Sequence, residues 1–244
     1  MKRHLPNALT CLNLLCGCVA LTLILDFDLA PVATQTLPWG VLVQAAFLIG
    51  IAAVADFFDG LVARALRVSS PIGKDLDSLA DMVSFGVVPG AILFKLLQYA
   101  LPAAGLPDSL AYLAFTVSIF SALRLAKFNN DTRQSDSFIG VPTPANTMLI
   151  AALPVILNHD QFGVGSLILN PWVLLGLTFL MSGLLVAELP LFALKFKNFT
   201  WQDNSLRFVF LGLSAGLLLL LQAAAVPLII LLYVLLSVLR PAAG

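Results

Sequence analysis

Five aspartates lie within residues 54–86, between two strongly apolar stretches of the chain. Asp56 and Asp59 are separated by three positions and Asp77 and Asp81 by four. Each pair therefore falls on one face if its segment is helical. The connection between the two segments is short and rich in serine, proline and glycine, which predicts a turn between antiparallel neighbouring helices. Four carboxylates would then meet near one end of a helix pair.

Small and basic residues accompany these carboxylates. Gly60, Ala63 and Arg64 continue the helix face that begins with Asp56 and Asp59. Glycine and alanine remove side-chain bulk, which lets a phosphate or a nucleotide approach the backbone. The pattern is therefore suited to binding a phosphorylated ligand beside the acidic cluster.

The remainder of the chain has the composition of an integral membrane protein. Of 244 residues, 60% are hydrophobic and 11% are charged. This excludes an ordinary water-soluble domain, and no feature indicates nucleic-acid binding. Taking about 20 apolar residues per crossing, we expect eight spans: residues 6–25, 39–66, 77–101, 107–128, 141–157, 171–189, 206–221 and 226–239.

The fold class expected is therefore an all-α, polytopic transmembrane bundle. It would form one integral membrane domain over residues 1–244, with the acidic motif at 56–81 and two additional C-terminal helices within 206–239. One long tilted helix could replace those last two spans. Charge favours the eight-helix arrangement, because seven spans would place Arg240 on the opposite side from most basic residues.

The distribution of lysine and arginine predicts the orientation. Twelve of the 13 basic residues fall on one side of the eight-helix arrangement, and positively charged loops remain in the cytoplasm. The exception is Lys95, near the far end of the third span, where its long stem can reach the interface. The acidic cluster is thus expected to face the cytoplasm.

Clustered carboxylates in a membrane need a partner. One uncompensated aspartate in the middle of a membrane helix costs about 2.5 to 3.5 kcal/mol. Arg64 can balance one of them, but Mg²⁺ or Mn²⁺ matches several carboxylate oxygens better and accepts phosphate oxygens in its open positions. The cluster therefore indicates metal-assisted phosphoryl or phosphatidyl transfer.

Two other interpretations of the aspartates remain open. They could form salt bridges at the membrane surface, with the small residues serving helix packing. They could also belong to a cation transporter or a proton relay. A transport path predicts polar groups across the bilayer, whereas the outer halves of the expected spans are nearly free of them. The distribution favours an enzyme that works at one side of the membrane.

The motif Asp56-x-x-Asp59-Gly60-x-x-Ala63-Arg64, then eight residues, then Gly73-x-x-x-Asp77-x-x-x-Asp81, resembles the signature of the CDP-alcohol phosphotransferase family. The resemblance implies transfer of a substituted phosphate from a CDP-linked donor to an alcohol, with release of CMP. It also implies a core of six transmembrane helices over about residues 5–190, a homodimer and a location in the cytoplasmic membrane of a bacterium.

The same resemblance implies two divalent cations, Mg²⁺ or Mn²⁺, between the second and third helices. Asp56, Asp59 and Asp77 would coordinate metal, and Asp77 and Asp81 would face the second ion. Asp81 would also be the general base.

Four further segments resemble the subgroup of the family that uses L-serine as the acceptor: LPNALTCLNLLCG, DMVSFGVVPG, SALRLAKFNND and FIGVPTPAN. The reaction implied is transfer of the phosphatidyl group from CDP-diacylglycerol to L-serine. Glycerol 3-phosphate, inositol phosphate or another alcohol is the alternative acceptor. The expected partners are these substrates, the lipid bilayer and a second copy of the chain.

The residues expected to bind CDP-diacylglycerol lie in the first three spans. Asn7 and Thr10, one turn apart, could contact the nucleotide, although ordinary helix capping explains them equally well. The full expected donor-binding set is Asn7, Thr10, Asp56, Gly60, Ala63, Arg64, Gly73 and Asp77.

Arg124 and Lys127 lie at i and i+3 near the cytoplasmic end of the fourth span. A guanidinium at Arg124 could grip the carboxylate of serine through two parallel hydrogen bonds. It could instead hold the donor phosphate, or both residues could be simple flanking charges. In the last case the serine pocket is expected around Ser84, Phe85 and Gly86.

Overall fold

The computed structural model describes residues 4–26, 39–68, 70–130, 138–192 and 200–239. It is almost entirely helical, as expected for an all-α bundle. The long elements are α1 (Leu5–Leu25), α2 (Gly40–Leu66), α3 (Pro71–Asp81), a π-helical turn (Met82–Val87), α4 (Val88–Ala103), a 3₁₀ segment (Asp108–Phe115), α5 (Thr116–Asn130), α6 (Thr143–Asn158), α8 (Pro171–Val186), α9 (Trp201–Leu221) and α10 (Ala225–Leu239). Two-residue strands β1 (Phe138–Ile139) and β2 (Pro190–Leu191), the 3₁₀ turns Gln161–Gly163 and Gln222–Ala224, and α7 (Gly165–Ile168) complete the chain.

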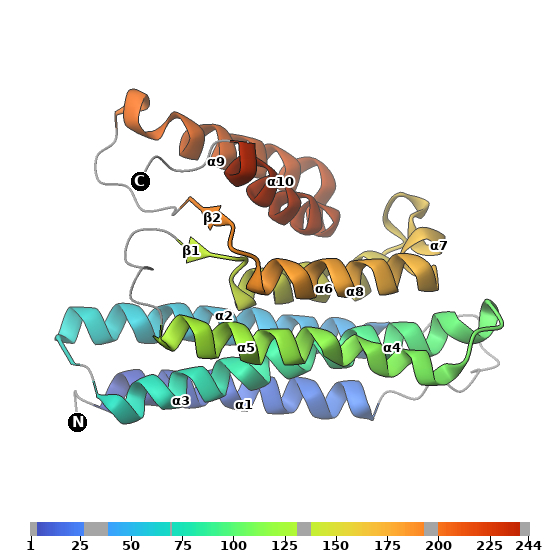
Figure 1. The fold of residues 1–244 in the computed structure, drawn as a ribbon, viewed down its shortest axis with the longest axis horizontal. Coiled ribbons are helices and arrows are strands. Elements are labelled where there is room, and N and C mark those ends of the chain that lie inside the picture. Colours follow the sequence, from blue (N-terminus) through green and yellow to red (C-terminus); the bar gives the residue numbers. More distant parts are fainter. Residues whose placement is uncertain (1–3, 27–38, 69, 131–137, 193–199, 240–244) are drawn as a thin grey trace.

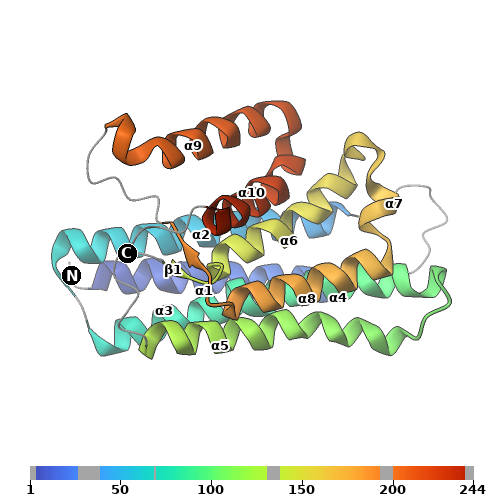
Figure 2. The same cartoon turned by 45° about the horizontal axis from the view of Figure 1, so that its top comes forward.

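The helices form a layered bundle (Figure 1). Helices α1 to α5 run lengthwise beside one another, α6 packs on α2, and α8 packs on α5. The α9–α10 pair lies beyond α6, and Figure 2 shows α10 running back beneath α9. Five helical stretches are long and apolar enough to cross a membrane by length and composition. The chain is therefore an integral membrane protein.

The eight expected spans each correspond to an apolar helical stretch, but two boundaries were wrong. The third stretch begins at Pro71, six residues earlier than expected, because the side chain of Ser70 accepts a hydrogen bond from the backbone N–H of Gly73 and caps the helix. The seventh begins at Trp201 rather than at 206.

Two of the stretches, α6 and α8, contain only 16 residues each. The last two stretches do not form one straight helix. Gln222 adopts φ 48° and ψ −120°, which ends α9 and lets the chain reverse into α10.

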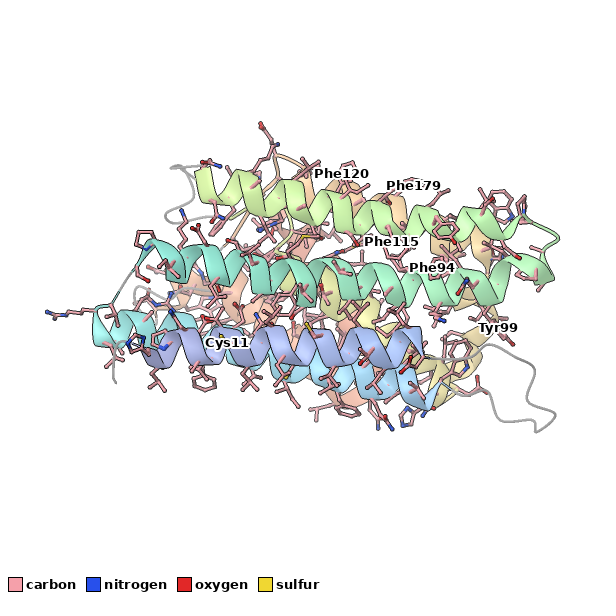
Figure 3. The ribbon with its side chains drawn as sticks, turned by 90° about the horizontal axis from the view of Figure 1, so that it is seen from below. Cys11, Phe94, Tyr99, Phe115, Phe120 and Phe179 are labelled. Atoms are coloured by element: carbon pink, nitrogen blue, oxygen red, sulfur yellow. The ribbon has the colours of Figure 1, made fainter. Side chains whose placement is uncertain are left out.

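Buried apolar side chains from α4 lie at the centre of the bundle. Ile92, Leu93, Leu96 and Leu97 are completely buried, as expected for a helix that is surrounded by other helices rather than by lipid. Phe94 of α4 packs against Phe115 of the following 3₁₀ segment, with ring centroids 5.4 Å apart and the ring planes tilted by 33°. Figure 3 shows these two labelled rings between α4 and the helical stretch that leads into α5.

Hydroxyl groups fasten the π-helical turn to three neighbours. Ser84 Oγ donates to the carbonyl of Asn13 in α1 at 3.0 Å. Thr147 Oγ1 of α6 donates to the carbonyl of Phe85 at 2.9 Å, and Ser118 Oγ of α5 donates to that of Gly86 at 2.8 Å. The turn follows directly after Asp81, so these bonds fix the helix at the end of the acidic motif.

Described basic residues gather at one end of the bundle. The end of α2, the start of α3 and the end of α5 all lie there (Figure 1), and Lys74 Nζ donates to the carbonyl of Asn129 at 2.9 Å. Lys95 lies at the other end, where its Nζ donates to the carbonyl of Leu25 at 3.4 Å. Lys2, Arg3, Arg133, Lys195, Lys197 and Arg240 lie outside the described residues.

Candidate active site

Three carboxylates converge between α2 and α3, where the helical spacing predicts them. Asp56, Asp59 and Asp77 each present an oxygen, and these oxygens lie within 4.8 Å of one another. Two unit charges at that separation repel by about 3 kcal/mol at an effective dielectric constant of 20. The cluster can hold a metal ion, because a hard divalent cation removes this repulsion.

Two features of the donor atoms fit a metal. Asp59 is only 7% exposed, and its Oδ2 accepts a hydrogen bond of 2.6 Å from Thr10 Oγ1. Asp77 Oδ1 is buried and has no hydrogen-bond partner among the described residues. A buried carboxylate oxygen without a partner is costly in a folded protein, so it is a suitable ligand for a cation.

Asp81 lies one turn further along the chain, at the junction with the π-helical turn. Its Oδ1 accepts a hydrogen bond of 3.1 Å from Asn13 Nδ2 of α1. The carboxylate also interacts electrostatically with Asp56 and Asp77. The structure therefore brings all four motif carboxylates into one site, with Asp81 beside the group of three.

A cavity of about 1010 Å³ opens next to this cluster. It lies between the start of α1, the end of α2 and the start of α3. Six residues of the expected donor-binding set line it, namely Asn7, Thr10, Gly60, Ala63, Gly73 and Asp77, and the expected metal ligand Asp59 lines it as well. Asp56 and Arg64, which complete the set, are not among the lining residues.

The two motif glycines have different surroundings. A methyl group added at Gly73 would stand 3.0 Å from Ser70 Oγ and 3.2 Å from Asn7 Oδ1. The same group at Gly60 would meet only Arg64 Nη1, at 3.9 Å. Gly73 therefore permits close packing at the α3 cap, whereas Gly60 keeps the cavity open.

Sequence reasoning missed several residues of the cavity rim. His4, Arg67, Ser70 and Lys74 line it. Arg67 ends α2 with φ 52°, and its backbone N–H bonds back into the last turn. For Arg67, Ser70 and Lys74, the position in and beside the turn between the two motif helices was the available signal, whereas His4 directly precedes α1. Arg67 and Lys74 give the cavity a basic rim next to Asp59 and Asp77.

Arg124 points into the protein. It is 6% exposed, its Nε donates to the carbonyl of Val141 at 2.6 Å, and its guanidinium lies 5.8 Å from the ring centroid of Phe128. It also interacts electrostatically with Asp81 and with Tyr233. Lys127, in contrast, is exposed. The two residues therefore do not form one binding pair in this structure.

Ser84, Phe85 and Gly86 are buried in the π-helical turn. The hydroxyl of Ser84 and the carbonyls of Phe85 and Gly86 are hydrogen-bonded to α1, α6 and α5. None of the three lines the cavity. These three residues therefore pack between helices, directly after Asp81 in the chain. The serine pocket that we expect around them if Arg124 does not bind a substrate remains a prediction.

Fold and site together define a polytopic membrane protein with a carboxylate centre beside a cavity. Residues 3–188 match the profile of the CDP-alcohol phosphatidyltransferase family, and the chain belongs to that family.

Several similar proteins are named CDP-diacylglycerol–serine O-phosphatidyltransferase. The chain is 32% identical to the one from Bacillus subtilis over 163 residues, which are 67% of this chain and 82% of the relative. It is 33% identical to one from Helicobacter pylori over 188 residues, 75% of this chain and 74% of the relative. A third, from Saccharomyces cerevisiae, is 33% identical over 179 residues, 66% of this chain and 59% of the relative.

Proposed function

We propose that the chain transfers the phosphatidyl group of CDP-diacylglycerol to L-serine, producing phosphatidylserine and CMP. The observation that carries the proposal is the carboxylate cluster beside the cavity of about 1010 Å³. The names of the relatives described above supply the donor and the acceptor. The family accounts for the reaction type.

Asp56, Asp59 and Asp77 are the residues that would hold one divalent cation, and Asp77 and Asp81 would face a second. Mg²⁺ and Mn²⁺ both suit carboxylate oxygens. When bound, such ions neutralise negative charge that develops on the pyrophosphate as CMP leaves.

The cavity supplies the donor site. His4, Arg67 and Lys74 at its rim offer hydrogen-bond donors to phosphate oxygens, and Asn7 and Thr10 offer polar groups to the nucleotide. Gly60 and Ala63 leave room for the ligand against α2. The two acyl chains of the donor would extend from the cavity into the bilayer.

Asp81 and Arg124 supply the acceptor side. Asp81 takes the proton as the serine O–H bond breaks. The serine oxygen forms a bond to the lipid-linked phosphorus, and the bond from that phosphorus to the bridging pyrophosphate oxygen breaks, releasing CMP. Arg124 uses Nε for Val141, so its two Nη groups are left to bind the serine carboxylate in parallel.

We also propose the setting of the enzyme. The carboxylate end faces the cytoplasm because that end carries most of the basic residues. The chain works in the cytoplasmic membrane of a bacterium, as a homodimer of single-domain subunits covering residues 1–244. Residues 201–239 form a hairpin added to the family core.

The test is to incubate the purified protein with CDP-diacylglycerol, Mn²⁺ or Mg²⁺, and separately L-serine, glycerol 3-phosphate or inositol phosphate. Of the three acceptors, only L-serine is expected to give a product, namely phosphatidylserine together with an equal amount of CMP. Chelation and the Asp59→Asn variant should each abolish the product. A phosphatidyl product with another alcohol would identify a different acceptor. The absence of any lipid product, together with cation flux in vesicles, would support a transporter instead.

A further inference from the structure

Asn13 of α1 is the one side chain outside the aspartate motif that bonds to Asp81 among the residues the structure describes. It is completely buried. An ionised carboxylate only accepts hydrogen bonds, so the amide must direct its NH₂ group toward Asp81. Its own oxygen then points elsewhere.

The side-chain oxygen of Asn13 does not form a compensating hydrogen bond with the described part of the protein. Asn13 Oδ1 is buried without a hydrogen-bond partner among the described residues. Leaving a buried acceptor unpaired destabilises a fold, whereas an apolar side chain of the same size at this position would not. Asn13 is therefore a poor choice for stability alone. Its bond to Asp81 is the interaction that the buried amide does make.

The backbone around Asn13 is held against the helix that carries Asp81. Ser84 Oγ donates to the carbonyl of Asn13 at 3.0 Å. Gly17, one turn further along α1, contacts Ser84 so closely that a larger residue would collide with it. The distance between α1 and the π-helical turn is thereby fixed, and the amide is held in register with the carboxylate.

A second bond of the same kind lies one turn earlier on α1. Thr10 Oγ1 donates to Asp59 Oδ2 at 2.6 Å. Thr10 and Asn13 are at i and i+3, so both project from one face of α1 toward the acidic site. One face of α1 therefore contacts a carboxylate of α2 and a carboxylate of α3.

We propose that Asn13 is a positioning residue for the general base. By occupying Oδ1 of Asp81, it fixes the orientation of the carboxylate and leaves Oδ2 as the oxygen that takes the proton of the acceptor hydroxyl. This inference rests on the proposed function, in which Asp81 is the base. Asn13 itself touches neither substrate.

The test compares three variants in detergent-purified protein: Asn13→Leu, Asn13→Asp and the control Ser118→Ala. Leucine removes the donor and the unpaired oxygen together, and aspartate keeps the size but cannot donate when ionised. Ser118→Ala removes a buried bond to the same π-helical turn from α5, without touching Asp81. The kcat, both KM values and the thermal midpoint are measured for each.

We expect Asn13→Leu and Asn13→Asp to lose about 10²-fold in kcat, because a misplaced catalytic group costs a factor of this order. Both KM values should stay within about twofold. The thermal midpoint of Asn13→Leu should be unchanged or higher. Ser118→Ala should show the reverse, with a lower midpoint and kcat within about threefold.

A double variant sharpens the result. Once Asp81→Asn has removed the base, adding Asn13→Leu should cause no further loss in kcat, because the two residues act through one step. Multiplying losses would show that Asn13 acts independently and would overturn the proposal. An unchanged kcat in Asn13→Leu would also overturn it. If neither Asn13 variant folds, the amide is needed for stability rather than for positioning Asp81, and the proposal is again overturned. If the wild type forms no phosphatidylserine, the proposed function fails first and separately.

Discussion

Gly60 lines the cavity and, as a glycine, has no side chain that would occupy space there. It lies in the middle of a helix, where glycine is less stable than alanine by about 0.5 to 1 kcal/mol. Apart from the backbone of its own helix, the atom nearest to an added methyl group is Arg64 Nη1, at 3.9 Å. Packing within the protein therefore does not require glycine there, and we propose that the donor bound in the cavity does.

Gly60→Ala is accordingly expected to raise the thermal midpoint and to raise the KM for CDP-diacylglycerol about tenfold, equivalent to about 1.4 kcal/mol. Gly50→Ala on the same helix is the matched control, because its added methyl meets nothing within 4 Å. It should give the same stabilisation with an unchanged KM. Equal KM values in the two variants would mean that the donor does not approach α2 at Gly60.

Variants of Arg124 and Lys127 distinguish a residue that binds a substrate from a basic residue that only sets the orientation of the helices in the membrane. Arg124→Lys keeps the charge but loses the planar pair of donors. We expect the KM for serine to rise about tenfold or more, with the KM for CDP-diacylglycerol nearly unchanged. The exposed Lys127 should tolerate Lys127→Gln without an effect on either constant. If only the donor constant moves in Arg124→Lys, the guanidinium binds the donor phosphate instead.

At the scale of elements, the C-terminal hairpin is joined to the core through Tyr233. Its hydroxyl donates to the carbonyl of Phe192 at 2.8 Å, and its ring packs on Phe192 and Phe210. Phe192 directly follows β2, which pairs with β1. The chain after β1 leads to Val141, whose carbonyl holds Arg124. The hairpin therefore supports the residue proposed to bind the acceptor.

Tyr233→Phe keeps the ring contacts and removes one buried hydrogen bond, a loss of about 1 kcal/mol. We expect a lower thermal midpoint and a higher KM for serine, with the KM for CDP-diacylglycerol unchanged. Tyr112→Phe, at a side chain that is 66% exposed, is the control and should change neither property. A midpoint shift without any change in the serine KM would limit Tyr233 to a stabilising role.

Local periodicity accounts for the part of the site that could be predicted. Asp56 and Asp59 on one helix and Asp77 and Asp81 on the next follow from positions three and four apart, and the short turn makes these helices neighbours. The start of α3 at Pro71 was missed although Ser70-Pro71 is a common helix-start signal. The bond from Asn13 to Asp81 could not be predicted, because it joins residues 68 positions apart and no local pattern encodes it.

At the scale of the whole molecule, the two ends of the bundle differ in charge. The carboxylate end carries Arg64, Arg67 and Lys74, whereas Lys95 contacts the end of α1 at the other side. Because basic residues stay in the cytoplasm during insertion, the cavity should open to the cytoplasm and the turn after α6 should face outward.

Cysteine labelling measures this orientation. In a background without Cys11, Cys16 and Cys18, an impermeant thiol reagent should modify Asp75→Cys only from the cytoplasmic side and Asn158→Cys only from the outside. Both positions are exposed. Modification of both from the same side would contradict the arrangement of the helices relative to the membrane.

The π-helical turn Met82–Val87 restricts which mutations this protein can accept during evolution. A π-helical turn holds an additional residue compared with an α-helical turn, and each residue rotates a helix by about 100°. The helix before the turn is thereby offset from the helix after it. Deleting one residue from the turn would straighten the helix but rotate one half against the other. Either Asp77 and Asp81 would leave the cluster, or the buried face of α4 would turn toward lipid. Substitutions can therefore accumulate along this helix, but its length between Asp81 and Val88 is fixed.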